Sequence, residues 1–439
     1  MPSPRSAPGW LFSKEWHELL ASRAWWIFLF LMGPLVGVSF ISAARTYAEA
    51  SGLGGTSAGV GEAFSPLVGI WAPTFSACEL AAAFLLPFVA IRLVAGDRQS
   101  GARKLELQHR MSALTRMGVK AAVLLAGWWL ALLAPAAAVV LWKSYGGSIY
   151  FPELMTVVVG HLLNAGLTIA LAGAAAAITE HPATAAIVTL AVTVGSWIIN
   201  FIAAVHGGWW ERIAGYTPTA MVAEFQHGLV RLDVVLTALV LNGAGLALAA
   251  IWVRLGVAVR RRVHESIAIA AIAAGVIFAC SFLPASWDLS ESRMNSFSRA
   301  DERALLGIRA PLRIEVHLAP EDPRRVDLER RALSKLRRLM PQLRVEYISA
   351  TSIGMFEQTS AHYGEIWYEL GGRREINRAT TPEGVLETIY SLAGITPPES
   401  AEEFRGHPLA VAPRGAALIF YVVWPAIVAA ISLLVQRRQ

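Results

Sequence analysis

The sequence predicts a polytopic α-helical membrane protein that is interrupted by one water-soluble α+β domain. Of its 439 residues 55% are hydrophobic and only 16% are charged, whereas soluble domains average about 25% charged residues. The charge is also uneven, because residues 285–414 carry 37 charged residues in 130 while the other 309 residues carry 33. All the long apolar runs lie outside this charged segment, so we expect it to be a soluble insert between membrane spans.

Eight apolar runs are long enough to cross a bilayer, which takes about 20 predominantly apolar residues. They are 24–43, 70–94, 119–142, 154–178, 183–205, 232–252, 267–283 and 416–435. The predicted organisation is an N-terminal interfacial segment at 1–23, a six-span unit at 24–260, a seventh span at 261–283, an α+β domain at 284–415, and an eighth span with a cytoplasmic tail at 416–439.

The distribution of Lys and Arg predicts the orientation of these spans. With the N-terminus in the cytoplasm, the inner tails and short loops hold 15 Lys and Arg residues, and the short outer loops hold 4. Basic residues favour the cytoplasmic side of a membrane. We therefore expect both termini to be cytoplasmic and the insert to be extracytoplasmic, in a multi-pass protein of the cell (inner) membrane.

The segment 10–23 precedes the first span and has an amphipathic pattern. Its apolar side chains can share one broad face: Trp10, Phe12, Trp16, Leu19 and Leu20. Its charged side chains are expected to stay on the polar side: Lys14, Glu15, Glu18 and Arg23. Such a pattern predicts a helix that lies in the membrane interface.

The charged insert contains strand and helix patterns in a defined order. The expected elements are a strand at 311–319, a helix at 324–340, a strand at 342–349, a hairpin at 364–377 and a helix at 381–395. The strands alternate apolar and polar residues, and the helices have apolar residues at helical spacing. The order βαβ followed by ββα is typical of a thioredoxin-like sandwich. The insert has no cysteine, so the redox chemistry of that fold is not expected.

No motif for catalysis, cofactor binding or metal binding is found. The chain lacks a G-x-x-x-x-G-K-[ST] loop, so it is not expected to bind ATP by that route. The Gly-rich stretch 51–61 lacks the lysine of such a loop. The two cysteines, Cys78 and Cys280, lie inside apolar runs, which excludes a disulfide framework. The insert carries 18 basic and 19 acidic residues, so a nucleic-acid partner is not expected.

Polar residues within the predicted spans are candidates for a translocation path, because they are costly in lipid and often functional. Glu79 lies in the second span. His161 and Asn164 share one face of the fourth span at i, i+3 spacing. The alternative is that these groups only make hydrogen bonds between helices.

Between the second and third spans, residues 97–120 hold six basic and two acidic side chains. One interpretation is ordinary positive-inside charge. The other is a helix along the membrane surface that docks a cytoplasmic partner. The candidate docking residues are Arg98, Arg103, Lys104, Glu106 and Arg110.

Residues 10–260 resemble the permease of an ABC-2 type exporter. The resemblance includes the interfacial helix, the charged loop 97–118 and the segment 216–235. In that last segment the family has a Pro, an aromatic residue, a Gly and an acidic residue, matched by Pro218, Phe225, Gly228 and Asp233. The charged loop is similar to the family's E-x-x-x-G-T-L-E-x-L-L pattern at Ser100-Gly101 and Leu105-Glu106-Leu107. It departs from that pattern at two positions. The family's Thr is Ala102 in this chain, and the family's first Glu is either Asp97 or has no counterpart.

Residues 287–322 are similar to the start of the extracytoplasmic domain in auxiliary subunits of gliding-motility-type ABC transporters. The pattern D-L-[ST]-x-x-[KR]-x-x-[ST]-[LF]-S is matched by Asp288, Leu289, Ser290, Arg293, Ser296, Phe297 and Ser298. The domain in this chain is shorter than in separate auxiliary subunits. The chain therefore resembles a six-span permease fused to a two-span subunit with a reduced outer domain.

These resemblances imply the transmembrane permease subunit of an ATP-driven exporter, without an enzymatic activity of its own. ATP and magnesium would bind a separate ABC ATPase subunit, and a second permease copy or a homologue would complete the transporter. One alternative is a non-transporting mechanotransducer whose outer domain acts on an envelope protein. Another is an integral membrane enzyme on lipid-linked substrates, which would need clustered acidic or His residues at one interface.

Overall fold

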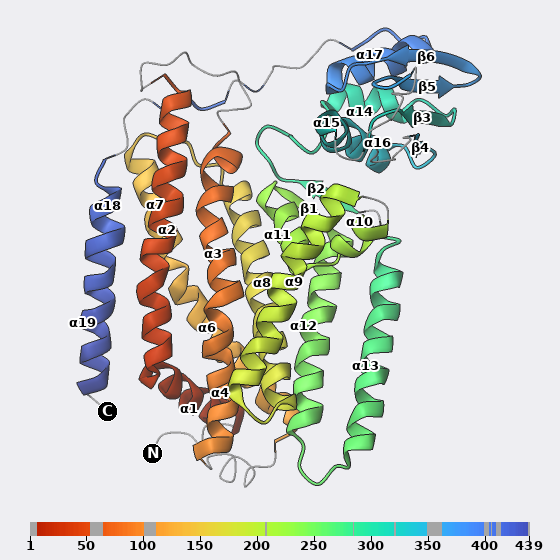
Figure 1. Ribbon diagram of the computed structural model, residues 1–439. Coiled ribbons are helices and arrows are strands. Elements are labelled where there is room, and N and C mark those ends of the chain that lie inside the picture. The colour runs from red at the N-terminus through yellow and green to blue at the C-terminus, as the bar shows by residue number, and fades with distance from the viewer. Residues whose placement is uncertain are drawn as a thin grey trace, which may run out of the picture. The chain divides into compact units, whose positions relative to one another are not determined.

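The computed structural model describes residues 7–52, 65–100, 111–206, 209–283, 285–319, 322–348, 362–398, 404, 406–409 and 414–437 (Figure 1). The chain divides into two compact units. We call them the helical unit, which comprises Met1–Ile198, Tyr216–Leu289 and Arg405–Gln439, and the α/β unit, which comprises Ile199–Gly215 and Ser290–Phe404.

All eight predicted apolar runs form helices that are long and apolar enough to cross a membrane. These are Arg23–Ala50, Leu67–Asp97, Ala113–Ser144, Phe151–Ile178, Pro182–Ala203, Leu232–Val253, Val259–Cys280 and Ala416–Arg437. The seventh helix begins at Val259, earlier than the predicted 267. Its first turn contains three consecutive arginines, which the prediction left out because they are not apolar. Arginine is nevertheless a good helix former, so the helix extends back through them.

The helices of the helical unit carry the labels of Figure 1. Their bounds are α1 Ala7–Ala21, α2 Arg23–Ala50, α3 Ala72–Phe84, α4 Leu86–Ser100, α6 Ala113–Ala131, α7 Leu133–Ser144, α8 Phe151–Ile178, α9 Pro182–His206, α11 Pro218–Gln226, α12 Leu232–Val253, α13 Val259–Cys280, α18 Ala416–Leu418 and α19 Trp424–Arg437. The end of α9, from Ile199, falls in the α/β unit. A π-helical turn at Leu67–Trp71 leads into α3, and another at Ile419–Val423 leads into α19. Pro87 lies just after the break between α3 and α4, as expected for a residue without an amide proton.

The helix α8 lies at the centre of this unit and contacts α3, α4, α6, α11 and α12. Small residues permit the close approach: a Cβ added at Gly245 of α12 would lie 2.9 Å from the Cβ of Ala170. We define the α1 end of the unit as the end with α1, the end of α4 and the start of α6. The α11 end is the opposite one, with α11 and the starts of α8 and α12 (Figure 1).

The first and last spans pack together through glycine and aromatic residues. A Cβ added at Gly33 of α2 would lie 2.1 Å from the ring of Trp424, and one added at Gly37 would lie 2.5 Å from the side chain of Phe420. Trp424 also donates a hydrogen bond from Nε1 to the Leu29 carbonyl at 2.8 Å. The seventh span, α13, instead packs against α12. The two spans that flank the α/β unit in the sequence therefore lie on different sides of the helical unit (Figure 1).

The α/β unit contains every element predicted for the insert. Its elements are α10 Trp209–Ala214, α14 Arg299–Leu306, β3 Leu312–Val316, α15 Pro323–Leu328, α16 Ser334–Leu339, β4 Arg344–Tyr347, β5 Ile366–Leu370, β6 Arg373–Asn377 and α17 Pro382–Ala393. A π-helical turn at Glu329–Leu333 joins α15 to α16. The sheet order is β4-β3-β5-β6, with β3 parallel to β4 and with β5 antiparallel to both of its neighbours.

The two faces of this sheet differ in chemistry. The inward side chains of β3 and β5 are buried with apolar residues of the helices and form one hydrophobic core. On the opposite face Arg313 contacts Glu346 at 2.7 Å, and Arg374 contacts Glu315 at 3.1 Å. The predicted hairpin turns at Gly371 and Gly372, whose φ angles are +58° and +82°. Two consecutive positive φ angles are the requirement of a type I′ turn, which glycine meets without strain.

A short antiparallel pair in the helical unit was not predicted. It joins β1, Leu229–Arg231, to β2, Ser286–Asp288. Three-residue strands are too short to show the alternation on which a sequence prediction depends. The pair joins the segment that follows α13, which contains β2, to the segment that precedes α12, which contains β1.

Candidate functional site

The segment predicted to be an interfacial helix is helical, as α1, but its buried side differs from the prediction. The buried residues are Leu11, Glu15 and Leu19, whereas Trp10 and Phe12 are 38% and 37% exposed. The expectation that Glu15 stays on an exposed polar side is therefore wrong. The side at i, i+4, i+8 faces the neighbouring helices, because α1 packs against α6 and α4.

Glu15 belongs to a buried group of charges at the α1 end, which we call the ion network: Lys14, Glu15, Asp97 and Lys120. Lys120 Nζ lies 2.6 Å from Glu15 Oε1 and also contacts Asp97. Lys14 Nζ lies 2.9 Å from Asp97 Oδ1 and 3.0 Å from Glu15 Oε1. The side chains of Glu15, Lys120 and Asp97 are only 0%, 5% and 6% exposed, so solvent screens these pairs little.

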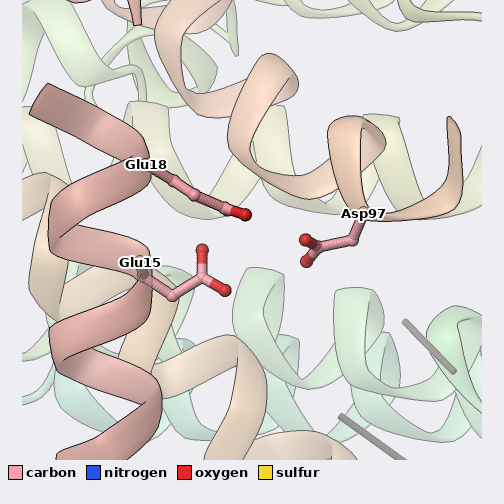
Figure 2. A group of neighbouring side chains, drawn as sticks. All are labelled: Glu15, Glu18 and Asp97. Carbon is pink, nitrogen blue, oxygen red and sulfur yellow. The ribbon is translucent and has the colours of Figure 1, made fainter. Parts of the chain in front are cut away.

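Figure 2 shows three carboxylates at this place, with Glu15 and Glu18 of α1 pointing toward Asp97 of α4. Each offers an oxygen within 4.8 Å of the others, which is close enough to hold a metal ion. Lys14 and Lys120 contact these carboxylates, so two ammonium groups already compensate most of the charge of the three carboxylates. The donor set therefore fits an ion-pair network better than a metal site.

The buried position changes the proton affinity of the network. Burial raises the pKa of the Glu15 carboxyl to about 7, and Asp97 adds to the rise while Lys120 and Lys14 oppose it. The charge of the network at the α1 end thus changes near neutral pH.

The ion network connects both sides of the charged loop. Asp97 lies in the last turns of α4, before the loop, and Lys120 lies in the second turn of α6, after it. Ser112 caps α6 by accepting a hydrogen bond from the Thr115 amide at 3.0 Å. Four predicted docking residues, Arg103, Lys104, Glu106 and Arg110, lie outside the described residues; for Arg98 only the backbone, in α4, is described.

Glu15, Asp97 and Lys120 were not predicted to be partners. In the sequence Lys120 counts as one of many basic residues at the ends of spans, and Glu15 as one polar residue of an amphipathic helix. A signal was present, since Lys120 stands among apolar residues and needs an anionic partner there.

At the α11 end, Glu79 of α3 accepts hydrogen bonds from the side chains of Trp197 and Thr219. Thr219 belongs to α11 and lies 3.2 Å from Ser196 Oγ of α9. The ring of Trp197 is in an edge contact with Phe84, with ring centroids 5.4 Å apart. Glu79 therefore joins α3, α9 and α11.

His161 and Asn164 lie on the same side of α8, as predicted, and both are buried. His161 Nε2 lies 3.3 Å from Gln226 Nε2 at the end of α11, and its ring lies 5.6 Å from that of Phe75. Asn164 lines a narrow crevice together with Pro218 and Phe225. All three predicted residues thus contact or adjoin α11, although Glu79 and His161 meet opposite ends of that helix.

The family-like residues of the segment 216–235 have structural roles in α11 and the following turn. Pro218 occupies the first turn after the Thr217 cap. Phe225 packs on Gly160 of α8, where an added Cβ would lie 2.5 Å from the Phe225 side chain. Gly228 has a φ of +75°. Asp233 pairs with Arg231 at 2.7 Å.

The matched residues at the start of the α/β unit are also structural. Ser290 Oγ accepts a hydrogen bond from the Met294 amide at 3.0 Å, and Arg293 pairs with Glu302 at 2.9 Å. Ser298 caps α14 by accepting a hydrogen bond from the Asp301 amide at 3.1 Å. Phe297 is buried in the core of the unit. The pattern thus specifies a compact turn that leads into a capped helix.

The α1 end also has a cavity between α4 and the start of α9. Its volume is about 420 Å³, and its lining includes Phe88, Arg92 and Pro182. Comparison with known proteins adds no identity: no protein-family model matches the chain, and no curated protein matches it. The two resemblances rest on the residues described above.

Proposed function

We propose that the chain is the membrane subunit of an ABC-2 type exporter that is driven by a separate ATPase. In this proposal it is a multi-pass protein of the inner membrane with both termini in the cytoplasm and residues 284–415 outside. The observation that carries the proposal is the ion network, because it holds α1 to both sides of the charged loop.

A loop that receives force from an ATPase has to pass it to the spans. Asp97 lies at the end of the helix that enters the loop, and Lys120 lies in the helix that leaves it. Their contact with each other and with Glu15 makes the two helices and α1 one cross-linked element. A movement of the loop would then displace all three helices together, as coupling requires. Arg98, Arg103, Lys104, Glu106 and Arg110 would form the docking surface.

Glu79 and His161, which contact α11, support an export path that ends at this helix. Glu79 and His161 are costly in the interior of a bilayer, and both contact α11. In the proposal α11 covers the outer end of the path, and Asn164 lines it. A second permease copy, or a homologue, would complete the path.

We propose that the α/β unit is thioredoxin-like. In support, its four strands have the order β4-β3-β5-β6, and only β5 runs opposite to the others. The insert has no cysteine, so its role would be to bind a substrate, an envelope protein or another copy of itself.

One observation favours the mechanotransducer as a second candidate. The helices that flank the α/β unit in the sequence pack on different partners, α13 on α12 and the last span on α2. A relative movement of α2 and α12 would therefore be passed to the α/β unit from two sides. In this alternative nothing crosses the membrane, and an envelope protein receives the movement.

The test is affinity purification of the full chain in a mild detergent, with ATPase activity assayed on the purified material. We expect a stoichiometric ATPase subunit, which is lost in the double variant Arg103→Glu, Lys104→Glu. The matched control is Arg260→Glu, Arg261→Glu, which reverses the same charge at the start of α13 and should retain the ATPase. A chain that purifies alone, without ATPase activity, would refute both ABC proposals.

A further inference from the structure

Glu79 is an acidic residue in a predicted span without a basic partner among the described residues. In the part of the chain that the structure describes, the side chains of Trp197 and Thr219 donate hydrogen bonds to it. An ionised carboxylate is costly within the apolar part of a bilayer. A carboxylate in this position would be stabilised, when ionised, by a cation that comes from outside the described residues.

The carboxylate keeps room for such a partner. An ionised carboxylate has about four acceptor positions, and Trp197 and Thr219 occupy two of them. Glu79 is only half-buried, and its neighbour Leu80 is 39% exposed. The side of α3 that carries both residues is therefore open to a ligand from the membrane or from a neighbouring subunit.

The surroundings of Glu79 suit an organic cation better than a metal ion. Hard metal ions take six or more oxygen ligands, and the side-chain hydrogen bonds at this place bring together the oxygens of three residues, Glu79, Thr219 and Ser196. Among the described residues the metal-like group of carboxylates lies at the α1 end instead. Trp197 donates a hydrogen bond to Glu79, and the ring of Phe84 lies in edge contact with that of Trp197. Aromatic rings attract large, weakly hydrated cations.

We propose that Glu79, Trp197 and Phe84 form a binding site for amphipathic organic cations such as quaternary ammonium or phosphonium compounds. Glu79 supplies the counter-charge, and the two rings supply apolar and cation–π contacts. As a statement about substrate class the inference rests on the proposed exporter function, but binding itself requires no ATPase. Because Thr219 belongs to α11, displacement of α11 removes one hydrogen bond from Glu79 and changes the site.

The experiment is equilibrium binding of tetraphenylphosphonium to the purified full chain in nanodiscs. Tetraphenylborate is the control ligand, because it has nearly the same shape and the opposite charge. We expect saturable binding of the cation, a loss of at least tenfold in affinity in Glu79→Gln, and a several-fold loss in Trp197→Leu. The matched control is Glu180→Gln, which removes an exposed carboxylate from the loop between α8 and α9 and should bind as the wild type does.

Three results would overturn the proposal: absence of saturable cation binding, equal affinity in Glu79→Gln, or equal binding of tetraphenylborate. Displacement of the cation by millimolar sodium would also overturn it, in favour of a metal-ion site. Should Glu79→Gln fail to fold, the wild-type chain provides the test. A hydrophobic carbodiimide should modify Glu79, and tetraphenylphosphonium should protect it whereas tetraphenylborate should not; modification unaffected by the cation refutes the site.

This experiment is distinct from the test of the proposed function. A wild-type chain that purifies without an ATPase but binds the cation would refute the exporter and keep the cation site. Retention of the ATPase without cation binding would refute only the substrate class.

Discussion

Replacement of Lys120 by methionine is the sharpest perturbation of the ion network. Lys120 Nζ contacts the carboxylates of Glu15 and Asp97 and also donates to the Leu93 carbonyl at 3.3 Å. Methionine has a similar length and is apolar, so it removes the charge with little change in volume. The variant leaves two buried carboxylates with one ammonium, that of Lys14, between them.

The expected cost follows from burial. Removing one partner of a buried ion pair destabilises a protein by about 3–5 kcal/mol, because the other charge stays desolvated without compensation. The side chains of Glu15 and Asp97 are at most 6% exposed, so solvent screening does not reduce this cost. Lys14 still contacts both carboxylates. We therefore expect the lower end of the range, about 3 kcal/mol.

The assay is a denaturant titration in detergent at pH 8, followed with a thiol-reactive dye. Cys78 is completely buried in α3, so its reaction with the dye reports the opening of the helical unit. The matched control is Lys143→Met, which removes an exposed lysine at the end of α7. We expect that control to change the free energy of unfolding by less than about 0.5 kcal/mol.

A triple variant distinguishes ion pairing from packing. Adding Glu15→Gln and Asp97→Asn to Lys120→Met removes the uncompensated charges and should recover most of the lost stability. A loss below about 1 kcal/mol in Lys120→Met alone would refute the buried network. A triple variant no more stable than the single one would show that Lys120 acts through packing.

Three further predictions concern packing, pH and the α/β unit. Gly33→Ala should cost about 1–3 kcal/mol, because its Cβ would lie 2.1 Å from the ring of Trp424; Gly243→Ala, with nothing within 4 Å of its Cβ, should be neutral or stabilising in the same titration. The pKa of Glu15 is raised from its ordinary 4.5 to about 7, so the folded protein binds the extra proton between these values. The stabilisation that comes from this proton on Glu15 is complete below about pH 4.5 and is lost as the pH rises through 7. In a Glu15→Gln variant this pH dependence of the free energy of unfolding should disappear, and an unchanged pH profile would contradict the assignment. Asn377→Ala should cost about 2 kcal/mol, because its side chain joins β6 to α17 with a 2.7 Å hydrogen bond and accepts two backbone amide protons; faster limited proteolysis of the α/β unit in the full chain would report it.

The elements of this protein are largely determined by the sequence. The eight apolar runs were recognisable because a helix that crosses a bilayer satisfies its own backbone hydrogen bonds and has only to be long and apolar. The elements of the insert were recognisable for a similar reason. Thr381-Pro382 begins a helix, and Gly371-Gly372 permits a tight turn, whatever packs on them later.

The tertiary structure decided which polar groups meet. The sequence places Glu15, Asp97 and Lys120 in three separate segments, and nothing local indicates that they share one buried site. Their meeting depends on which side of α1 packs against α4 and α6, and the amphipathic pattern placed Glu15 on the exposed side instead. The same holds for Glu79, whose donors come from α9 and α11. Local patterns determine helices and strands because their energetics act over a few residues, whereas a buried charge finds its partner only when distant helices pack.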